Sequence, residues 1–377
     1  MTVSAPPSDL APRLAGLTLA EIEIPNGREE EWRFTPLKRL AGLHELNSTP
    51  AFVSFSVDAP AGVEVSELVS EVSFPAADRI AAAAATLSES TLTISIPREA
   101  VIDQPLLVRI AGGSEPSVGR FEVHAGKYSQ TQVLLDHTGS GAQAVAGQFF
   151  VEDGAQLTIV SVHDGDRTHV LGGQHAISLG RDSKVTHVAV TLGGDVVRMV
   201  TTVEYTQPGG DAILSGAFFT DAGQHHEHRL FVDHALPHCR SDVMYKGVLQ
   251  GQDAHSVWIG DVLIRGNAVG TSTYEINRNL ILTDGARADS VPNLEIETGE
   301  IEGAGHASTT GRFDEEQIFY LTSRGIPLVE AKRLVVRGFL VEIIDRIPVE
   351  DVRARLLAGV ESRLGESSAL FGEDDDD

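Results

Sequence analysis

The sequence predicts a mainly β protein, and two observations support that. Between residues 92 and 319, short apolar runs such as TLTISIP and QLTIVSVHDG alternate with turns rich in Gly, Asp and Asn, a pattern typical of many short strands. A turn, a small residue and an apolar run also recur at unequal spacing; the small residues are Ala155, Ser183, Ala212, Ala254 and Ala286. Unequal spacing fits a solenoid whose turns have loops of different length. A β-sandwich has similar strand content, so the pattern alone leaves both architectures open.

Residues 1–91 precede this core and have a different composition. They are rich in Ala, Leu and Pro, and we expect a helix around residues 28–43. Mixed helix and strand should follow through the segment ADRIAAAAATLSE. We interpret this region as an N-terminal cap of the β core.

Residues 320–377 form a helical region with an acidic tail. Pro327 suits a first helical position, and Glu330 places negative charge in the first turn, so a helix should begin near Pro327. Its apolar sector is too wide to face water, which means that other elements must cover it. Pro348 should end this helix, and a second, more charged helix is expected over residues 349–364.

Composition restricts the class of function. The 377 residues carry 54 acidic and 29 basic side chains, a formal charge of −25, with no Lys/Arg cluster. This argues against a nucleic-acid or anionic-membrane surface. One cysteine, Cys239, excludes an intrachain disulfide, and neither a signal-peptide pattern nor a run of about 20 apolar residues is present. We therefore expect a cytoplasmic protein.

Phosphate-loop, dinucleotide, zinc-protease and nucleophile-elbow motifs are also missing, so we expect no enzyme activity.

Several long segments resemble the SufB/SufD family of iron–sulfur cluster assembly proteins. HASTTGRFDEEQIFYLTSRGIP (306–327) and RLVVRGFLVEIIDRIP (333–348) are similar to the family's C-terminal signature. The similarity extends to HRLFVDHALPHCRSDVMYKGVLQG (228–251) and NRNLILTDGARADSVPNLEIE (277–297). It reappears in REEEWRFTPLKRL (28–40). About 130 residues are covered densely.

The resemblance implies a fold and a function. Family members have a right-handed parallel β-helix between helical N- and C-terminal regions, which favours the solenoid here. The chain is more similar to the SufD branch than to the SufB branch, because SufB proteins carry cysteines proposed to hold a nascent cluster. The implied role is a non-catalytic scaffold subunit of a SufBCD complex. It would pair with SufB through its β-helix, which could also self-pair as a homodimer, and with the ATPase SufC through its C-terminal helices.

The resemblance also implies site residues. In related sequences a cysteine often stands two positions before the histidine that matches His306, and here that position is Ala304. His306 would supply an imidazole to iron, or to a transient cluster, shared with SufB. No cluster should be held by this chain alone, since one cysteine provides one thiolate. The candidate SufC contacts lie at and after the entry to the first C-terminal helix: Arg324, Gly325, Ile326, Leu328, Ala331, Val335 and Phe339.

Two alternative functions remain open from the residues. The segment QHHEH, together with His234 and His238, favours a homodimeric metal-binding protein if its imidazoles converge. In a strand, His226 and His228 would share one face while His225 and Glu227 share the other. The second alternative is a β-helix enzyme acting on an acidic or sugar substrate, with Trp258, Tyr274 and Arg278 on neighbouring rungs. Cys239 is expected to be a buried thiol, although the adjacent Arg240 could lower its pKa.

Overall fold

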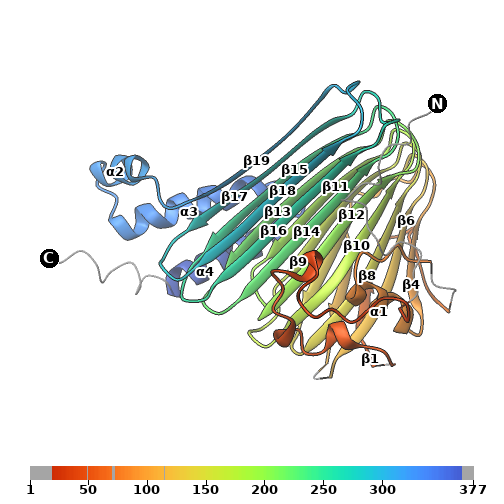
Figure 1. Ribbon diagram of the computed structural model, residues 1–377, viewed down its shortest axis with the longest axis horizontal. Coiled ribbons are helices and arrows are strands. Elements are labelled where there is room, and N and C mark those ends of the chain that lie inside the picture. Colours follow the sequence, from red (N-terminus) through yellow and green to blue (C-terminus); the bar gives the residue numbers. More distant parts are fainter. Residues whose placement is uncertain (1–18, 49, 70–72, 114, 367–377) are drawn as a thin grey trace.

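The computed structural model describes residues 19–48, 50–69, 73–113 and 115–366, and most of them belong to two β-sheets (Figure 1). Within these residues, sheet A has ten strands and sheet B has nine. Sheet A contains β1 (Ala51–Phe52), β3 (Glu64–Leu68), β4 (Thr91–Ile96), β6 (Ser117–Ala125), β8 (Ala142–Val151), β10 (Val170–Leu179), β12 (Val196–Tyr205), β14 (His225–His234), β16 (His255–Ile264) and β18 (Arg287–Ile296). Sheet B contains β2 (Ser54–Asp58), β5 (Leu106–Ala111), β7 (Gln130–Thr138), β9 (Gln156–His163), β11 (Lys184–Thr191), β13 (Asp211–Thr220), β15 (Arg240–Leu249), β17 (Ser272–Ile281) and β19 (Gly303–Gly311).

The strand order identifies a solenoid. From β4 onward, successive strands alternate between the two sheets, and each pairs in parallel with the strand two positions along the chain. Each turn therefore contributes one strand to each sheet and stacks on the turn before it. The predicted parallel β-helix is confirmed, and the β-sandwich is excluded because its sheets would be antiparallel. The exceptions are the antiparallel pairs β2–β5 and β3–β4 at the N-terminal end.

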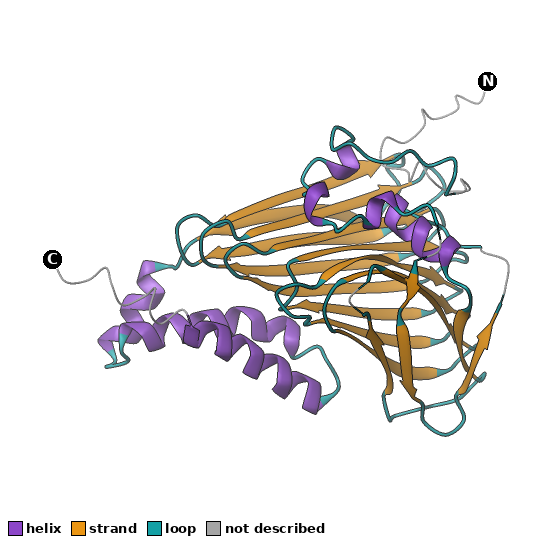
Figure 2. Cartoon of the chain, turned by 90° about the horizontal axis from the view of Figure 1, so that it is seen from below, coloured by secondary structure: helices purple, strands orange, loops and turns teal. Residues whose placement is uncertain are grey.

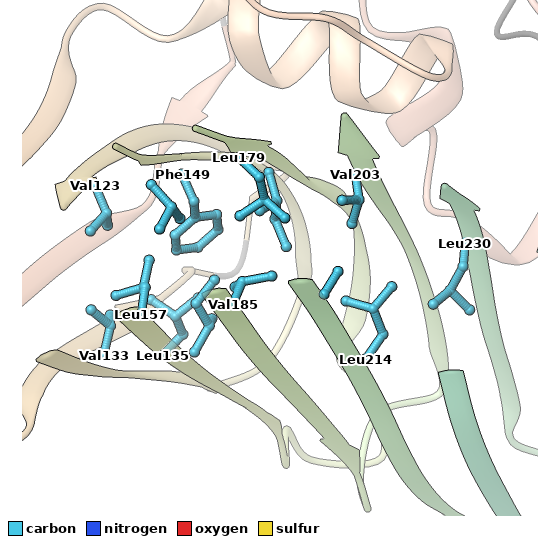
Figure 3. Close-up of a cluster of buried hydrophobic side chains, with 14 of the residues drawn as sticks. Val123, Val133, Leu135, Phe149, Leu157, Leu179, Val185, Val203, Leu214 and Leu230 are labelled. Carbon is cyan, nitrogen blue, oxygen red and sulfur yellow. The ribbon is translucent and has the colours of Figure 1, made fainter. Parts of the chain in front are cut away.

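Alternate side chains of both sheets fill the interior. Val133 and Leu135 of β7 meet Val123 and Phe149 of the opposite sheet, and the same arrangement continues through later turns (Figure 3). These side chains are 0–1% exposed. At roughly 25 cal/mol per Å² of apolar surface removed from water, this continuous interior is the main stabilising element of the fold.

Small buried residues stack at one corner of the solenoid. From β7 to β17, the residue immediately before each sheet B strand is buried; these residues are Ser129, Ala155, Ser183, Gly210, Cys239 and Thr271. The carbonyl of each accepts a hydrogen bond from the backbone N–H on the next turn, as in Lys184 N to Ala155 O (2.8 Å). The recurring small residues in the sequence therefore mark real corners. The sequence repeat combines different positions of the solenoid turn, however. Ala254 and Ala286 precede sheet A strands, and Ala212 lies within β13.

The N-terminal region covers the outer face of sheet A. The helix predicted over residues 28–43 is wrong: three short 3₁₀ turns stand there, η1 (Glu30–Trp32), η2 (Leu37–Arg39) and η3 (Leu43–Glu45). Pro36 disfavours the helical conformation at the residue before it, and Gly42 has φ +80°. The alanine-rich segment is the helix α1 (Arg79–Leu87), capped by the Asp78 side chain, which accepts from Ala81 N (2.8 Å).

The C-terminal helices cover the outer face of sheet B, so the two helical regions lie on opposite outer faces (Figure 2). They are α2 (Glu315–Ser323), α3 (Leu328–Ile344) and α4 (Glu350–Glu366). The predicted start of α3 is confirmed, with Pro327 at its N-cap, and α4 follows Pro348 as expected. Val336, Leu340 and Ile344 pack against sheet B residues, which explains the wide apolar sector. Among the described helices, none is long and apolar enough to cross a membrane.

Candidate partner and metal site at the open end of the solenoid

The C-terminal end of the solenoid is open. β18 and β19 are the last strands of their sheets, and in the described part of the chain neither has a second neighbour. Most side chains of β19 are exposed, whereas the central strands are almost wholly buried. An edge strand with unpaired N–H and C=O groups is a template for pairing with another chain.

The interior becomes polar at this end. The inward-facing residues of β17 are Thr273, Glu275, Asn277 and Asn279, each at most 5% exposed. Asn277 donates to the Tyr245 carbonyl (3.2 Å), and Asn279 donates to Asn277 Oδ1 (2.7 Å). Ser308 of β19 and Ser290 of β18 join the two sheets through their hydroxyls (2.8 Å). Buried polar groups cost free energy unless they are hydrogen-bonded, and in this lining Asn279 Oδ1 and both carboxyl oxygens of Glu275 have no hydrogen bond among the described residues.

Glu275 is the unusual member of this group. Its side chain is 1% exposed, and neither carboxyl oxygen has a hydrogen-bond partner within the described residues. Burial, and secondarily the charge of Asp261, raises its pKa to about 9, so the carboxyl group is neutral at pH 7. Gly260 makes room for it, because a Cβ there would lie 2.3 Å from Glu275 Oε2.

His306 faces Glu275 from the next strand. The two residues are register partners in the β17–β19 pair, and His306 Nδ1 lies 3.8 Å from Glu275 Oε1. The His306 side chain is 45% exposed, so this imidazole is open to solvent or to a partner while the carboxyl behind it is buried. Imidazole and carboxylate are both ligands of Fe²⁺. Sequence analysis missed Glu275, although period-two alternation in STYEINRN already places it with Thr273 and Asn277 on one face.

Ala304 and Cys239 leave this end without a nearby thiol. Ala304 is partly buried and packs against the interior, on the same strand face as His306. Cys239 occupies the stacked corner, where it is 0% exposed. Burial raises the pKa of its thiol, against weaker opposing hydrogen bonds from the backbone of Gly209 and Gly210. The expected burial of this thiol is confirmed, and burial is the largest influence on its pKa.

The residues predicted to contact an ATPase separate into two groups. Arg324 and Gly325 are exposed where α2 ends, and the Arg324 guanidinium lies 4.4 Å from the Tyr320 ring centroid. Ala331 is fully buried, and Phe339 packs against the core between α3 and sheet B, where Lys246 Nζ lies over its ring (4.8 Å). The others are partly buried: Ile326, Leu328 and Val335. Two exposed aromatic residues that sequence analysis did not select, Phe319 (73%) and Tyr320 (54%), lie beside the first group.

The histidines of the QHHEH segment do not converge. As alternation predicted, His226 and His228 face the interior, whereas His225 and Glu227 face outward. His226 is bonded to Thr220 Oγ1 (3.0 Å) and His234 to Ser241 Oγ (2.9 Å), and His238 is exposed in a turn. In the described ranges, no group of three or more His, Cys, Asp or Glu side chains is arranged to hold a metal ion.

The residues proposed for a carbohydrate-binding enzyme lie on opposite sides of the solenoid wall. Trp258 is inside and 0% exposed, whereas Tyr274 is 47% exposed on the outer face and Arg278 shares that outer face. They do not line one cleft.

Comparisons with known proteins agree with this geometry. Residues 108–339 match the family model described as SUF system FeS cluster assembly, SufBD core domain. A SufBD family iron–sulfur cluster assembly protein of Mycobacterium tuberculosis is 48% identical over 366 residues, covering 93% of this chain and 92% of that protein. One from Mycobacterium leprae is 47% identical over 93% of each chain. The iron–sulfur cluster assembly protein SufD of Escherichia coli is 22% identical over 90% of this chain and 89% of its own length. The chain belongs to the SufBD family of iron–sulfur cluster assembly proteins.

Proposed function

We propose that the protein is a SufD-type, non-catalytic scaffold subunit of a SufBCD-like complex. It uses two separate surfaces: the open end of the solenoid for a SufB-like chain, and the α2–α3 junction for a SufC-like ATPase. Family membership supports the assembly role, and the similarity to SufD over 90% of the chain supports the SufD branch. The observation that carries the proposal is the buried Glu275, which has no hydrogen bond among the described residues, behind the exposed His306 at an unpaired strand edge.

The first surface suits a second β-helix. β19 contains no proline and consists mainly of Gly, Ala, Ser and Thr, so its edge can be approached closely by another strand. A partner that covers this end would also bury the polar lining of β17 and could satisfy it with hydrogen bonds. The same edge allows a homodimer, in which two copies of the chain would pair β19 or β18 across a two-fold axis.

Iron is the cargo rather than a resident cofactor in this proposal. His306 and Glu275 supply two donors, and a SufB-like chain supplies the remaining ligands. Because Glu275 is protonated in the isolated chain at pH 7, it must release its proton to bind a cation. Iron entry would then be more favourable at higher pH. His306→Ala should reduce Fe²⁺ uptake by the complex without dissociating it.

The second surface is distinguished by exposed aromatic and cationic groups. Phe319, Tyr320 and Arg324 lie together on α2 and at its end, and no residue of α2 is buried. Aromatic residues and arginine are the groups that most often dominate binding energy at protein interfaces. Gly325, with φ +86°, sets the turn into α3 and so fixes the angle between the two helices.

Co-purification with the two partner homologues tests this assignment. Removing α3 and α4 would expose the apolar core that they cover, so point substitutions are the better probe. Phe319→Glu or Arg324→Glu should weaken SufC retention by roughly tenfold or more and leave SufB bound. Leu68→Glu, at a 52% exposed apolar residue of β3, is the matched control. A wild-type chain that retains neither partner would refute the SufD-type function.

A further inference from the structure

Two histidines on the outer face of sheet A turn the same ring atom toward each other. His225 and His255 begin β14 and β16, are register partners, and have their Nδ1 atoms 3.2 Å apart. The side chain of His225 is 1% exposed and that of His255 is 24% exposed. Solvent therefore reaches the pair from the His255 side.

The opposite ring nitrogen of each histidine faces a carboxylate. His225 Nε2 lies 3.2 Å from Glu227 Oε2, and His255 Nε2 lies 2.7 Å from Asp289 Oδ2. The four side chains contact one another in succession across β14, β16 and β18, in the order Glu227, His225, His255 and Asp289. The two imidazoles therefore lie between two carboxylates.

Neighbouring cations keep both carboxyl groups ionised. Burial tends to raise the pKa of Glu227, but Arg198 (3.3 Å), His225 and Arg229 lower it to about 2. Burial likewise opposes ionisation of Asp289, yet hydrogen bonds from Arg287 and His255 bring its pKa below the ordinary value. Both carboxylates are thus acceptors at neutral pH, and each Nε2 must carry a proton to donate to them.

This protonation pattern brings two nitrogen lone pairs face to face. Neutral imidazoles protonated at Nε2 have lone pairs at Nδ1, and two lone pairs at 3.2 Å repel each other. A cation between them removes the repulsion, and the choices are a shared proton or a metal ion. The His255 side chain is 24% exposed, so either cation can reach the pair from solvent.

We propose that His225 and His255 form a two-imidazole site for a borderline divalent cation of the Zn²⁺, Co²⁺ or Fe²⁺ class. Two nitrogens that bind one tetrahedral metal at about 2.0–2.1 Å lie about 3.3 Å apart, close to the spacing seen here. A carboxylate behind each ligating histidine is the usual outer-shell arrangement of such sites. Because the described residues add no third ligand, water or an added small ligand takes the remaining positions.

Titration of the purified full-length chain with Co²⁺, followed by visible absorption and by metal content after gel filtration, tests the site. Wild type should bind one equivalent that His255→Ala loses, and Asp289→Asn should weaken binding about 10–100-fold. His124→Ala is the matched control, since His124 is a partly exposed histidine paired with Glu122 at 3.2 Å. His306→Ala should also retain this equivalent, which separates the site from the iron donors of the proposed function.

Two results would overturn the proposal. One is a wild-type chain that binds no Co²⁺ beyond what His306→Ala abolishes, which would mean that the pair shares a proton. The other is a His255→Ala chain that keeps the full equivalent. Circular dichroism verifies that each variant is folded, and His255→Gln replaces the alanine variant if that one unfolds. Loss of partner binding is not expected for any of these variants. Co-purification therefore tests the scaffold proposal independently of this metal site.

Discussion

The two ends of the solenoid belong to the same pair of sheets but differ in their interior side chains and in their last strands. At the N-terminal end the interior is apolar, with Ile94, Leu106 and Val108 fully buried, and the antiparallel strands β2 and β3 complete the sheets. At the C-terminal end the interior changes to Thr273, Glu275 and Asn277, and β18 and β19 stop without a covering strand in the described chain.

From this difference in interior polarity we infer that the C-terminal end is the one that meets another molecule. Among the described residues, the N-terminal end strands β2 and β3 also have one free edge each, but the interior beside them is apolar. At the other end, a buried carboxyl without a hydrogen bond costs free energy that a partner or a cation could recover. The destabilising features of the C-terminal end are therefore the ones on which its proposed function rests.

The largest expected effect is the difference in the free energy of unfolding between a substitution in the apolar middle and one at the open end. Phe149→Ala should lower the free energy of unfolding by about 3–5 kcal/mol, because Phe149 is 0% exposed and packs edge-on against Phe121 (5.7 Å). Ser308→Ala, on the exposed β19, should change it by less than about 0.5 kcal/mol. Urea denaturation measures both, and similar losses for the two variants would show that the open end is as tightly packed as the middle.

Acid should destabilise the middle of the solenoid before the open end. His187 is fully buried, and burial, with a smaller contribution from His228, lowers its pKa from 6.5 to about 4. The unfolded chain therefore binds more protons below pH 6.5, and the stability present above that pH is lost as pH falls toward 4. His187 alone should account for up to about 3 kcal/mol. A His187→Gln chain whose stability depends on pH as steeply as wild type would contradict this.

Alkali should affect the open end in the opposite sense. The pKa of Glu275 is about 9 in the folded chain and near its ordinary 4.5 when unfolded, so the folded chain holds the proton longer and stability falls as pH rises between these values. Glu275→Gln removes this loss and should be more stable than wild type by about 1–3 kcal/mol at pH 8–9, and by less at pH 6. Denaturation at the three pH values checks the trend, and parallel curves would refute it.

The smallest effect concerns the attachment of α4, which is remote from both ends. Arg355 is 45% exposed and makes two hydrogen bonds to Asp136 of β7 (2.8 and 2.9 Å). Arg355→Ala should cost about 0.5–1 kcal/mol, since exposed ion pairs contribute little even with good geometry. Hydrogen exchange should show faster exchange in α4 only. Accelerated exchange in β19 would mean that α4 and the open end are coupled.

Much of the fold was predictable from local signals. Prolines and first-turn acids fix the ends of α3 and α4, and alternation correctly placed His226 and His228 on one face and His225 on the other. The segment after Arg28 was mispredicted because its shape depends on tertiary contacts. Trp32 stacks on the buried Arg198, 4.1 Å from ring centroid to guanidinium, and Thr35 donates to Glu227 (2.8 Å). These partners are about 165 to 190 residues away, beyond any local pattern.

The candidate site was predictable only in part, for the same reason. His306 was found through its motif, whereas its neighbour Glu275 is one turn of the solenoid earlier and is brought beside it by strand register. The pairing of His225 with His255 likewise follows from register rather than from the QHHEH segment. Positions in a solenoid become neighbours after one whole turn, and unequal loop lengths hide that period in the sequence.

The central claim is that the open end, and not the N-terminal end, is the partner interface. Ser308→Cys in β19 and Ser66→Cys in β3 place one thiol on each exposed end strand, and the native Cys239 is buried and should react slowly. We would measure the rate of maleimide labelling of each variant with and without the SufB homologue. The account predicts that the partner protects the thiol at position 308 and leaves the thiol at position 66 unchanged. Protection at position 66 with none at position 308 would contradict it.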